Sequence, residues 1–222
     1  MDPRVRISPP PLMTKIQKIL EFISFAEKLK VELRHSYTSN IKRRESVAEH
    51  TWMMCLLAVI LQKEIKTKIN LEKALKMIIV HDLAEVFAGD IPAFEKSIRA
   101  TNKQKNESIA MDKLLTYLPN KTLVREFKKL WLEFEECKKA EARYAQAMDK
   151  VEVIIQHNIA DIRTFGQGDF DINPYYKNDR FDFDDFLREF KDKVDVDTMN
   201  KIQRAGLMKR VPKYHQDRWA EK

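Results

Sequence analysis

The scarcity of glycine constrains the fold of this chain more than any other feature. The chain has 222 residues but only four glycines, at positions 89, 166, 168 and 206. Proteins built from strands and tight turns need many more, because their turns require backbone conformations that glycine adopts most readily. Apolar residues also recur with helical spacing, as at Ile16, Ile19, Leu20 and Ile23. The sequence therefore predicts an all-α fold.

Capping signals and periodicity place the expected helices. Ser46 and Glu49 form a capping box that starts an apolar helix running to about residue 65. Asn70 caps the next helix, which runs to the adjacent pair His81-Asp82 and is stopped by Gly89 and Pro92. The other expected elements are a first helix within 13–31, loops over 33–44 and 93–101, helices over 102–118, 121–136 and 138–164, an irregular stretch over 166–178, and short helices over 181–194 and 196–206.

The length predicts one domain with a small extension. We expect a disordered lead-in over residues 1–12, a helical domain over 13–165, and a region over 166–222 that combines an irregular connector, short helices and a loose basic tail from Lys209. The longest apolar run, Trp52 to Leu61, is 10 residues, whereas a membrane span needs ~20. We therefore expect no membrane association.

The cysteines and the net charge limit the cellular compartment and the kinds of partner that we expect. Cys55 and Cys137 lack a CxxC partner, which predicts reduced core thiols in a cytoplasmic protein. The net charge is +7, but the lysines are spread along the chain and no nucleic-acid-binding motif accompanies them. The charge therefore favours a phosphate-bearing small molecule over a nucleic acid.

Ionisable residues stand where three of the predicted helices should pack. His50 follows Val47-Ala48 and precedes Trp52, His81-Asp82 follows an apolar run, and Asp149 lies between Met148 and Val151. Each residue alone is most simply a satisfied core histidine or a carboxylate at a helix edge. Buried charges are usually paired or bound to a metal, and together these residues offer imidazole and carboxylate ligands. Such a ligand set suits Mn, Fe, Co, Ni or Zn.

At this point the sequence resembles a known family. The segments that carry the resemblance are Glu45-Ser-Val-Ala-Glu-His50, His81-Asp82-Leu-Ala-Glu85, Gly89-Asp90-Ile91 and Met148-Asp149-Lys150. They are similar, in order and spacing, to motifs of the HD-domain phosphohydrolases, and most of all to the branch of bacterial 5′-deoxynucleotidases and their eukaryotic relatives. The resemblance covers roughly residues 15–165.

The resemblance implies an HD-domain helical bundle that forms a homodimer and holds one divalent metal. The implied ligands are His50, His81, Asp82 and Asp149, and Glu85 and Asp90 are expected in the active site. Arg34 is expected to hold the phosphate. The deoxynucleotidases place a tryptophan after that arginine, against the sugar, whereas this chain has His35 there with Tyr37 nearby. We expect both residues at the substrate, but this departure leaves strict selection for 2′-deoxyribose open.

Glu85 and Asp90 are expected to have separate roles in the active site. Glu85 is four residues after His81 and three after Asp82, so a continuous helix would place all three on one face. A divalent metal lowers the pKa of its bound water toward ~7, and the resulting hydroxide can attack phosphorus in line. Glu85 is the candidate for steering that hydroxide or moving a proton. Asp90 follows a glycine that lets the backbone turn, and it is a candidate for binding the sugar or assisting with protons.

Several other residues have structural interpretations. We interpret Lys96, Arg99 and Lys103 as a solvated face, and His157 as structural or exposed. Gln156 either lines the pocket behind Asp149 or forms a buried amide contact between helices. The aromatic stripe that we assign to the core or to a subunit interface consists of Phe127, Leu130, Trp131 and Phe134.

The leading hypothesis is a metal-dependent phosphomonoesterase that hydrolyses nucleoside 5′-monophosphates, chiefly deoxynucleotides, through metal-bound hydroxide. One alternative is a phosphodiesterase or a triphosphohydrolase, but no histidine lies between Asp82 and Asp149 to build a second metal site. A second alternative is a non-catalytic nucleotide-binding protein, which would be expected to have lost ligands or Glu85. All of these residues are present.

Overall fold

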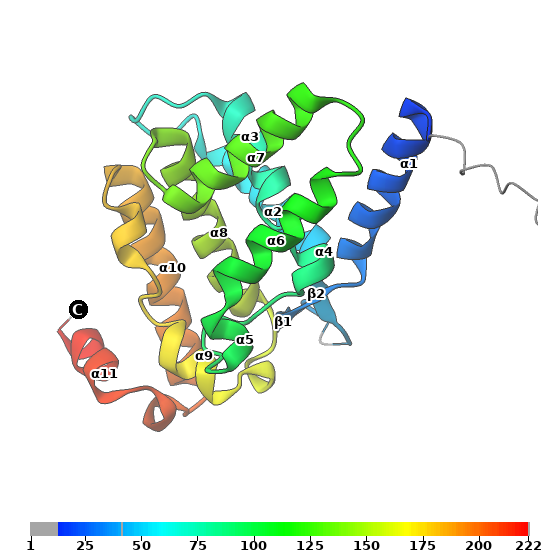
Figure 1. The fold of residues 1–222 in the computed structure, drawn as a ribbon. Coiled ribbons are helices and arrows are strands. Elements are labelled where there is room, and N and C mark those ends of the chain that lie inside the picture. Colours follow the sequence, from blue (N-terminus) through cyan, green and yellow to red (C-terminus); the bar gives the residue numbers. More distant parts are fainter. Residues whose placement is uncertain (1–12, 41, 222) are drawn as a thin grey trace, which may run out of the picture.

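The computed structural model describes residues 13–40 and 42–221, and the regular secondary structure among them is helical apart from one small hairpin (Figure 1). The all-α prediction is thus confirmed. The strands are β1 (Leu33–Tyr37) and β2 (Arg44–Ser46), and short 3₁₀ turns are η1 (Glu27–Lys30), η2 (Ile162–Thr164), η3 (Asn178–Phe181) and η4 (Met208–Arg210). The α-helices are α1 (Lys15–Ala26), α2 (Val47–Leu61), α3 (Leu71–His81), α4 (Glu85–Ala88), α5 (Ile98–Thr101), α6 (Lys103–Leu115), α7 (Lys121–Glu136), α8 (Ala140–Ile159), α9 (Gln167–Ile172), α10 (Asp185–Arg204) and α11 (Lys213–Ala220).

The predicted helix starts are confirmed at the level of single hydrogen bonds. The Glu49 amide donates to Ser46 Oγ at 3.3 Å, and the Ser46 amide donates to the Glu49 carboxylate at 2.9 Å, which completes the capping box of α2. Asn70 Oδ1 accepts from the Lys73 amide at 3.0 Å and caps α3. Such caps satisfy amides that have no partner inside the helix. They fix the entry points of the two helices that carry His50 and His81.

The prediction of a loop over residues 33–44 was wrong, because part of that segment pairs as an antiparallel hairpin. Leu33 pairs with Ser46 and Tyr37 with Arg44, so four residue steps on β1 face only two on β2. This irregularity is a bulge, which breaks the alternation of side chains between the two faces of a strand. Consecutive residues Arg34 and His35 therefore line the same cavity.

The second correction concerns the His-Asp pair. Helix α3 ends at His81, Asp82 is its C-terminal cap with φ −97° and ψ 8°, and Glu85 begins α4. The argument that His81, Asp82 and Glu85 share one helix face was therefore wrong. Leu83 and Ala84 are buried, so the apolar pattern of the sequence continues across the break between α3 and α4 and does not reveal it.

Two apolar clusters meet at α3 and position the end of that helix. Met77 and Ile78 belong to a cluster formed with α2, α7, α8 and α10, whereas Val80 and Leu83 belong to one formed with α1, η1, α6 and α7. His81 lies beside this transition, with its ring 5.0 Å from that of Phe134. The predicted core role of the α7 aromatic stripe is confirmed for its buried members, Leu130, Trp131 and Phe134.

The C-terminal region is more regular than predicted. Residues 185–204 form one continuous helix where a break was expected at residue 195, and Lys191 and Asp195 form a buried ion pair within it. The tail from Lys209 is not loose but carries α11, and Val211 and Trp219 pack on a third apolar cluster with Phe165 and Phe170. The division at residue 165 stays a prediction, and residues 1–12 lie outside the described residues. No helix among the described residues is long and apolar enough to cross a membrane.

Candidate metal centre and adjoining cavity

Two buried histidines, His50 and His81, both have Nε2 close to the Asp82 carboxylate, while Nδ1 of each ring has a different partner. His81 Nδ1 lies 2.6 Å from the Ile78 carbonyl oxygen, and His50 Nδ1 lies 2.5 Å from Glu152 Oε2. A carbonyl and a carboxylate can only accept, so each Nδ1 carries a hydrogen and Nε2 is the ring nitrogen that can bind a metal once it gives up any proton. This is the arrangement that orients histidine ligands around metals in proteins.

Carboxylate oxygens meet the two Nε2 atoms at ligand-like distances. Asp82 Oδ2 lies 3.0 Å from His81 Nε2 and 4.0 Å from His50 Nε2, and Asp149 Oδ1 lies 3.4 Å from His50 Nε2. Two ligands that each bind an ion at ~2.1 Å stand at most ~4.2 Å apart. His50 Nε2, His81 Nε2 and Asp82 Oδ2 are also buried without a hydrogen-bond partner among the described residues. This donor set fits a divalent metal.

The charge around these atoms also suits a cation. Burial raises the pKa of Asp149, but Lys150 and His50 outweigh it and hold that pKa well below its ordinary value. Burial and Arg34 lower the pKa of His50, whereas Glu152 and Asp149 raise it, and the balance is a pKa of about 10. Metal binding at His50 therefore competes with a proton and is favoured by rising pH. The carboxyl groups gathered here are those of Glu45, Asp82, Glu85, Asp90, Asp149 and Glu152.

Glu85 and Asp90 lie beside this cluster. Glu85 is 3% exposed, and burial, followed by repulsion from Asp82 and Asp90, raises its pKa well above its ordinary value. Gly89 has φ +74°, which a side chain disfavours, and it turns the chain so that the Asp90 amide donates to Glu32 Oε1 at 2.9 Å. The prediction of a glycine-assisted turn at Asp90 is confirmed.

Arg34 stands among the carboxylates. Its Nη1 lies 3.6 Å from Asp82 Oδ2 and 3.8 Å from Asp90 Oδ1, and its Nε lies 3.8 Å from Glu45 Oε2. The side chain is 12% exposed, and guanidinium keeps its charge even when buried. Lys150 Nζ lies 2.5 Å from Asp149 Oδ2. These are the two cations closest to the predicted metal ligands Asp82 and Asp149.

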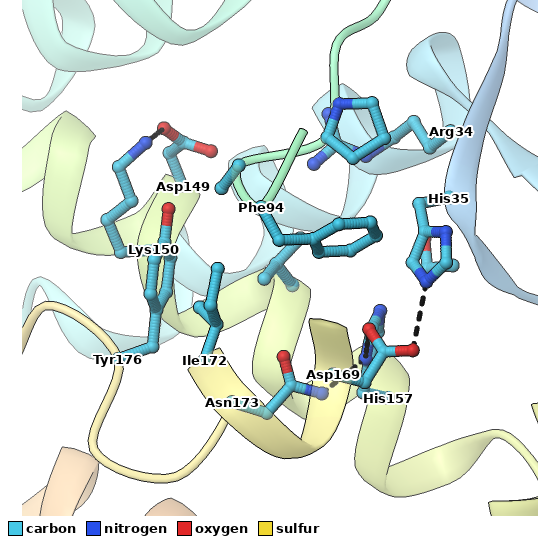
Figure 2. A pocket seen from close by; sticks show the side chains of 14 residues that line it. Arg34, His35, Phe94, Asp149, Lys150, His157, Asp169, Ile172, Asn173 and Tyr176 are labelled. Carbon is cyan, nitrogen blue, oxygen red and sulfur yellow. Dashed lines mark hydrogen bonds and ion pairs between the residues drawn. The ribbon is translucent and has the colours of Figure 1, made fainter. Parts of the chain in front are cut away.

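A cavity opens from Arg34 and Asp149 (Figure 2). Its walls come from β1, from the loop after Asp90, from α8 and from the segment around α9. His35 Nε2 lies 2.9 Å from Asp169 Oδ2, which ties the hairpin to α9. The side chains that the figure labels around the cavity include Phe94, Lys150, His157, Ile172, Asn173 and Tyr176.

Two of the three predicted substrate residues line the cavity, and the third does not. Arg34 and His35 line the cavity, whereas Tyr37 is not among its lining residues and its ring lies against the Arg44 guanidinium. Gln156 Nε2 donates to the Tyr37 carbonyl at 2.6 Å, so Gln156 makes an amide contact with β1 rather than with another helix, and it is not among the lining residues of the cavity. His157 is buried and lines the cavity, which the sequence did not indicate.

Glu152 is the most informative residue that the sequence analysis missed. It is completely buried on α8, three residues after Asp149, and its carboxylate accepts from His50. A carboxylate on the apolar face of a helix was a usable signal, because an unpaired buried charge is costly. The same reasoning applies to Glu45, which is 3% exposed and accepts from Ser36 Oγ at 2.8 Å.

We expect Glu152→Gln to weaken metal binding by roughly 10–100-fold, because the amide cannot fix the His50 tautomer as a carboxylate does. Titration of the metal-free protein with Co²⁺ measures the dissociation constant. Glu141→Gln on the same helix is the matched control, since Glu141 pairs with Lys73 instead. An unchanged affinity in Glu152→Gln would contradict the role of this carboxylate.

The comparisons with known proteins agree with this geometry. The HD domain family model matches residues 26–191. The chain is 30% identical over 141 residues to the human protein named 5′-deoxynucleotidase HDDC2, an alignment that covers 63% of this chain and 67% of the relative. It is 33% identical over 142 residues to the protein of the same name from Danio rerio, covering 64% and 68%. It is 32% identical over 146 residues to 5′-deoxynucleotidase hdd1 from Schizosaccharomyces pombe, covering 64% and 72%. The matched region thus spans about two thirds of each relative.

Solved structures show the same fold. A protein from Magnetospirillum magnetotacticum MS-1, described as a predicted metal-dependent phosphohydrolase, superposes with a TM-score of 0.74 at 22% identity, covering 89% of this chain and 96% of that one. The PH0347 protein from Pyrococcus horikoshii OT3 superposes with a TM-score of 0.61 at 25% identity, covering 80% and 99%. Both superpositions cover most of the chain.

Proposed function

The chain belongs to the HD domain family, and we propose that it is a metal-dependent phosphomonoesterase that hydrolyses nucleoside 5′-monophosphates to a nucleoside and orthophosphate. The observation that carries the proposal is the convergence of the partnerless His50 Nε2, His81 Nε2 and Asp82 Oδ2 beside Arg34. The relatives named 5′-deoxynucleotidases supply the substrate class, and deoxynucleotides are the first substrates to test.

We propose His50, His81, Asp82 and Asp149 as the ligands of one divalent ion. Two imidazoles with two carboxylates suit Co, Mn, Fe, Ni or Zn better than Mg or Ca, which prefer oxygen ligands. When bound, such an ion polarises the phosphate and lowers the pKa of water toward neutrality. Glu152 and the Ile78 carbonyl keep the two rings oriented for this role.

The remaining residues bind the substrate and move protons. Arg34 presents a charged fork suited to two phosphate oxygens, and Lys150 adds charge at the mouth of the cavity. A water oxygen bonds to phosphorus and gives up a proton while the bond from phosphorus to the 5′ oxygen breaks, and the leaving oxygen takes up a proton. Glu85 is the proposed proton donor or carrier, because it is buried beside Asp82 and Asp90, and this burial and repulsion raise its pKa and favour its protonated form. Asp90, fixed by the Gly89 turn, is proposed to contact the sugar or assist with protons.

A phosphate-release screen tests this function. The purified chain, loaded in turn with Co²⁺, Mn²⁺, Ni²⁺ or Zn²⁺, is assayed against each nucleoside and deoxynucleoside 5′-monophosphate. We expect orthophosphate from 5′-monophosphates and none from 3′-monophosphates, triphosphates or cyclic dinucleotides. Release of tripolyphosphate from triphosphates, or of no phosphate from any monophosphate, would refute the proposal.

We also propose that the protein is a cytoplasmic homodimer. Apolar residues at helical spacing on α1 are strongly exposed, from 45% at Ile19 to 71% at Ile16, and pairing with a second copy would bury them. The other exposed members of this stripe on α1 are Leu20 and Ile23.

The free thiols Cys55 and Cys137 suit a reducing compartment such as the cytoplasm, and cell fractionation tests this location.

We expect Ile19→Glu to shift the molecular mass measured by light scattering from that of two chains to that of one. A charge at the centre of the stripe cannot be desolvated at low cost. Ser24→Glu adds the same charge to α1 outside the stripe and should leave the mass unchanged. A wild-type mass of one chain would contradict the dimer.

A further inference from the structure

The cavity extends well beyond the residues that we assign to phosphate and metal. Arg34 and Asp149 are among its lining residues, and so are Phe94, Ile172 and Asn173. Phe94 comes from the loop after Asp90, Ile172 is the last residue of α9, and Asn173 is the C-terminal cap of that helix. The reaction at phosphorus leaves these three side chains without a role.

Phe94 and α9 pack so closely that the cavity wall is fixed. A Cβ atom on Gly168 would lie 2.4 Å from the Phe94 ring, so only glycine allows this approach. The Phe94 ring also meets the His35 ring edge-on with centroids 4.7 Å apart. Phe94 thus presents a supported aromatic surface to the cavity.

Asn173 supplies a polar atom with a fixed orientation. Asn173 is 4% exposed, and its Nδ2 lies 2.6 Å from His157 Nδ1. Burial lowers the pKa of His157 to about 4, so the imidazole is neutral at physiological pH and its Nδ1 accepts from the amide. Figure 2 shows the amide oxygen pointing the other way, toward the cavity between Ile172 and Phe94. That oxygen is an acceptor facing the part of the cavity that Ile172 and Phe94 line.

An aromatic face next to a hydrogen-bond acceptor recognises a planar heterocycle with N–H groups at its edge. We propose that Phe94 and Asn173 form the base subsite, in which the nucleobase stacks on Phe94 and donates a hydrogen bond to Asn173 Oδ1. This inference rests on the proposed function and names where the nucleoside part of the substrate lies. Asp169 supports the subsite, since its Oδ2 accepts from both His35 and the Gly166 amide at 2.9 and 2.8 Å.

The subsite is tested with a substrate that lacks the base. For each variant, kcat/KM is measured with deoxynucleoside 5′-monophosphates and with 2-deoxyribose 5-phosphate. Phe94→Ala should lower kcat/KM for the nucleotides by about 5–100-fold, the range of base–aromatic stacking. Asn173→Leu should lower it by up to about tenfold, the value of one hydrogen bond. Both variants should keep the wild-type rate on 2-deoxyribose 5-phosphate within about twofold, which also shows that they fold and bind metal.

A calorimetric titration with free deoxynucleosides separates this inference from the proposed function, because it needs neither metal nor catalysis. We expect wild type to bind a deoxynucleoside and both variants to bind it more weakly by the factors above. Equal losses on nucleotide and abasic substrate, or nucleoside affinity unchanged by both variants, would overturn the base subsite even if wild type releases phosphate. Nucleoside binding that depends on Phe94 and Asn173 without any phosphate release would uphold the subsite and refute the nucleotidase.

Discussion

His81→Ala is expected to reduce phosphate release from nucleoside 5′-monophosphates by about 10³-fold or more and to leave the protein without stoichiometric metal. The variant removes the Nε2 atom that lies 3.0 Å from Asp82 Oδ2 and leaves the carboxylates around it without a shared cation. Metal ions contribute several kcal/mol to such reactions, and ~4 kcal/mol corresponds to about 10³ in rate. Metal content is measured by mass spectrometry on the same samples that are assayed for activity.

His215→Ala is the matched control for this variant. His215 contacts the rings of Tyr175 and Tyr214 near the C-terminus, and it has no part in the metal site. It should keep full metal content and full activity. Circular dichroism of both variants shows whether the helical fold is kept. A folded His81→Ala protein with wild-type metal and activity would refute the ligand assignment.

Glu85→Gln is expected to lower kcat by about 10²–10⁴-fold, the usual contribution of a general acid or base, while metal content stays near wild type. Glutamine preserves the size of the buried side chain but cannot carry a proton to or from the reacting oxygens. Glu85 is not one of the proposed ligands, so metal binding and catalysis should separate in this variant, unlike in His81→Ala.

Glu107→Gln provides a control for removing a buried carboxyl near the same positive charge. Glu107 is 9% exposed and pairs with Lys103 at 3.4 Å, and Lys103 also acts on Glu85. We expect its kcat to change by less than about tenfold, since it lies outside the proposed proton path. A Glu85→Gln enzyme with wild-type kcat, or one that loses its metal, would contradict the role proposed for Glu85.

The parts of the fold that the sequence predicted depend on local chemistry. Caps at Ser46 and Asn70 are readable because the side chain and the amide that it accepts from are three residues apart. His50, His81 and Asp82 stand out because ionisable side chains at buried helix positions are costly unless they share a partner. Helices α2 and α3 contact each other, and both contact α8, which carries Asp149.

The parts that the sequence did not predict depend on contacts between distant segments. The His35–Asp169 pair joins residues 134 positions apart, and no local pattern announces it. The break after His81 was hidden because the buried apolar residues continue across it. The hairpin over residues 33–46 was missed because its residues are polar and its bulge removes the alternation that marks a strand.

The most direct test of the central claim is a titration of the metal-free protein with Co²⁺ while orthophosphate release from a deoxynucleoside 5′-monophosphate is followed. We propose His50, His81, Asp82 and Asp149 as the ligands of one ion, so we predict that activity is absent at first, rises linearly and reaches its plateau at one equivalent per chain. Phosphate release by the metal-free protein, or no release after saturation with any of the divalent ions tested, would contradict the account.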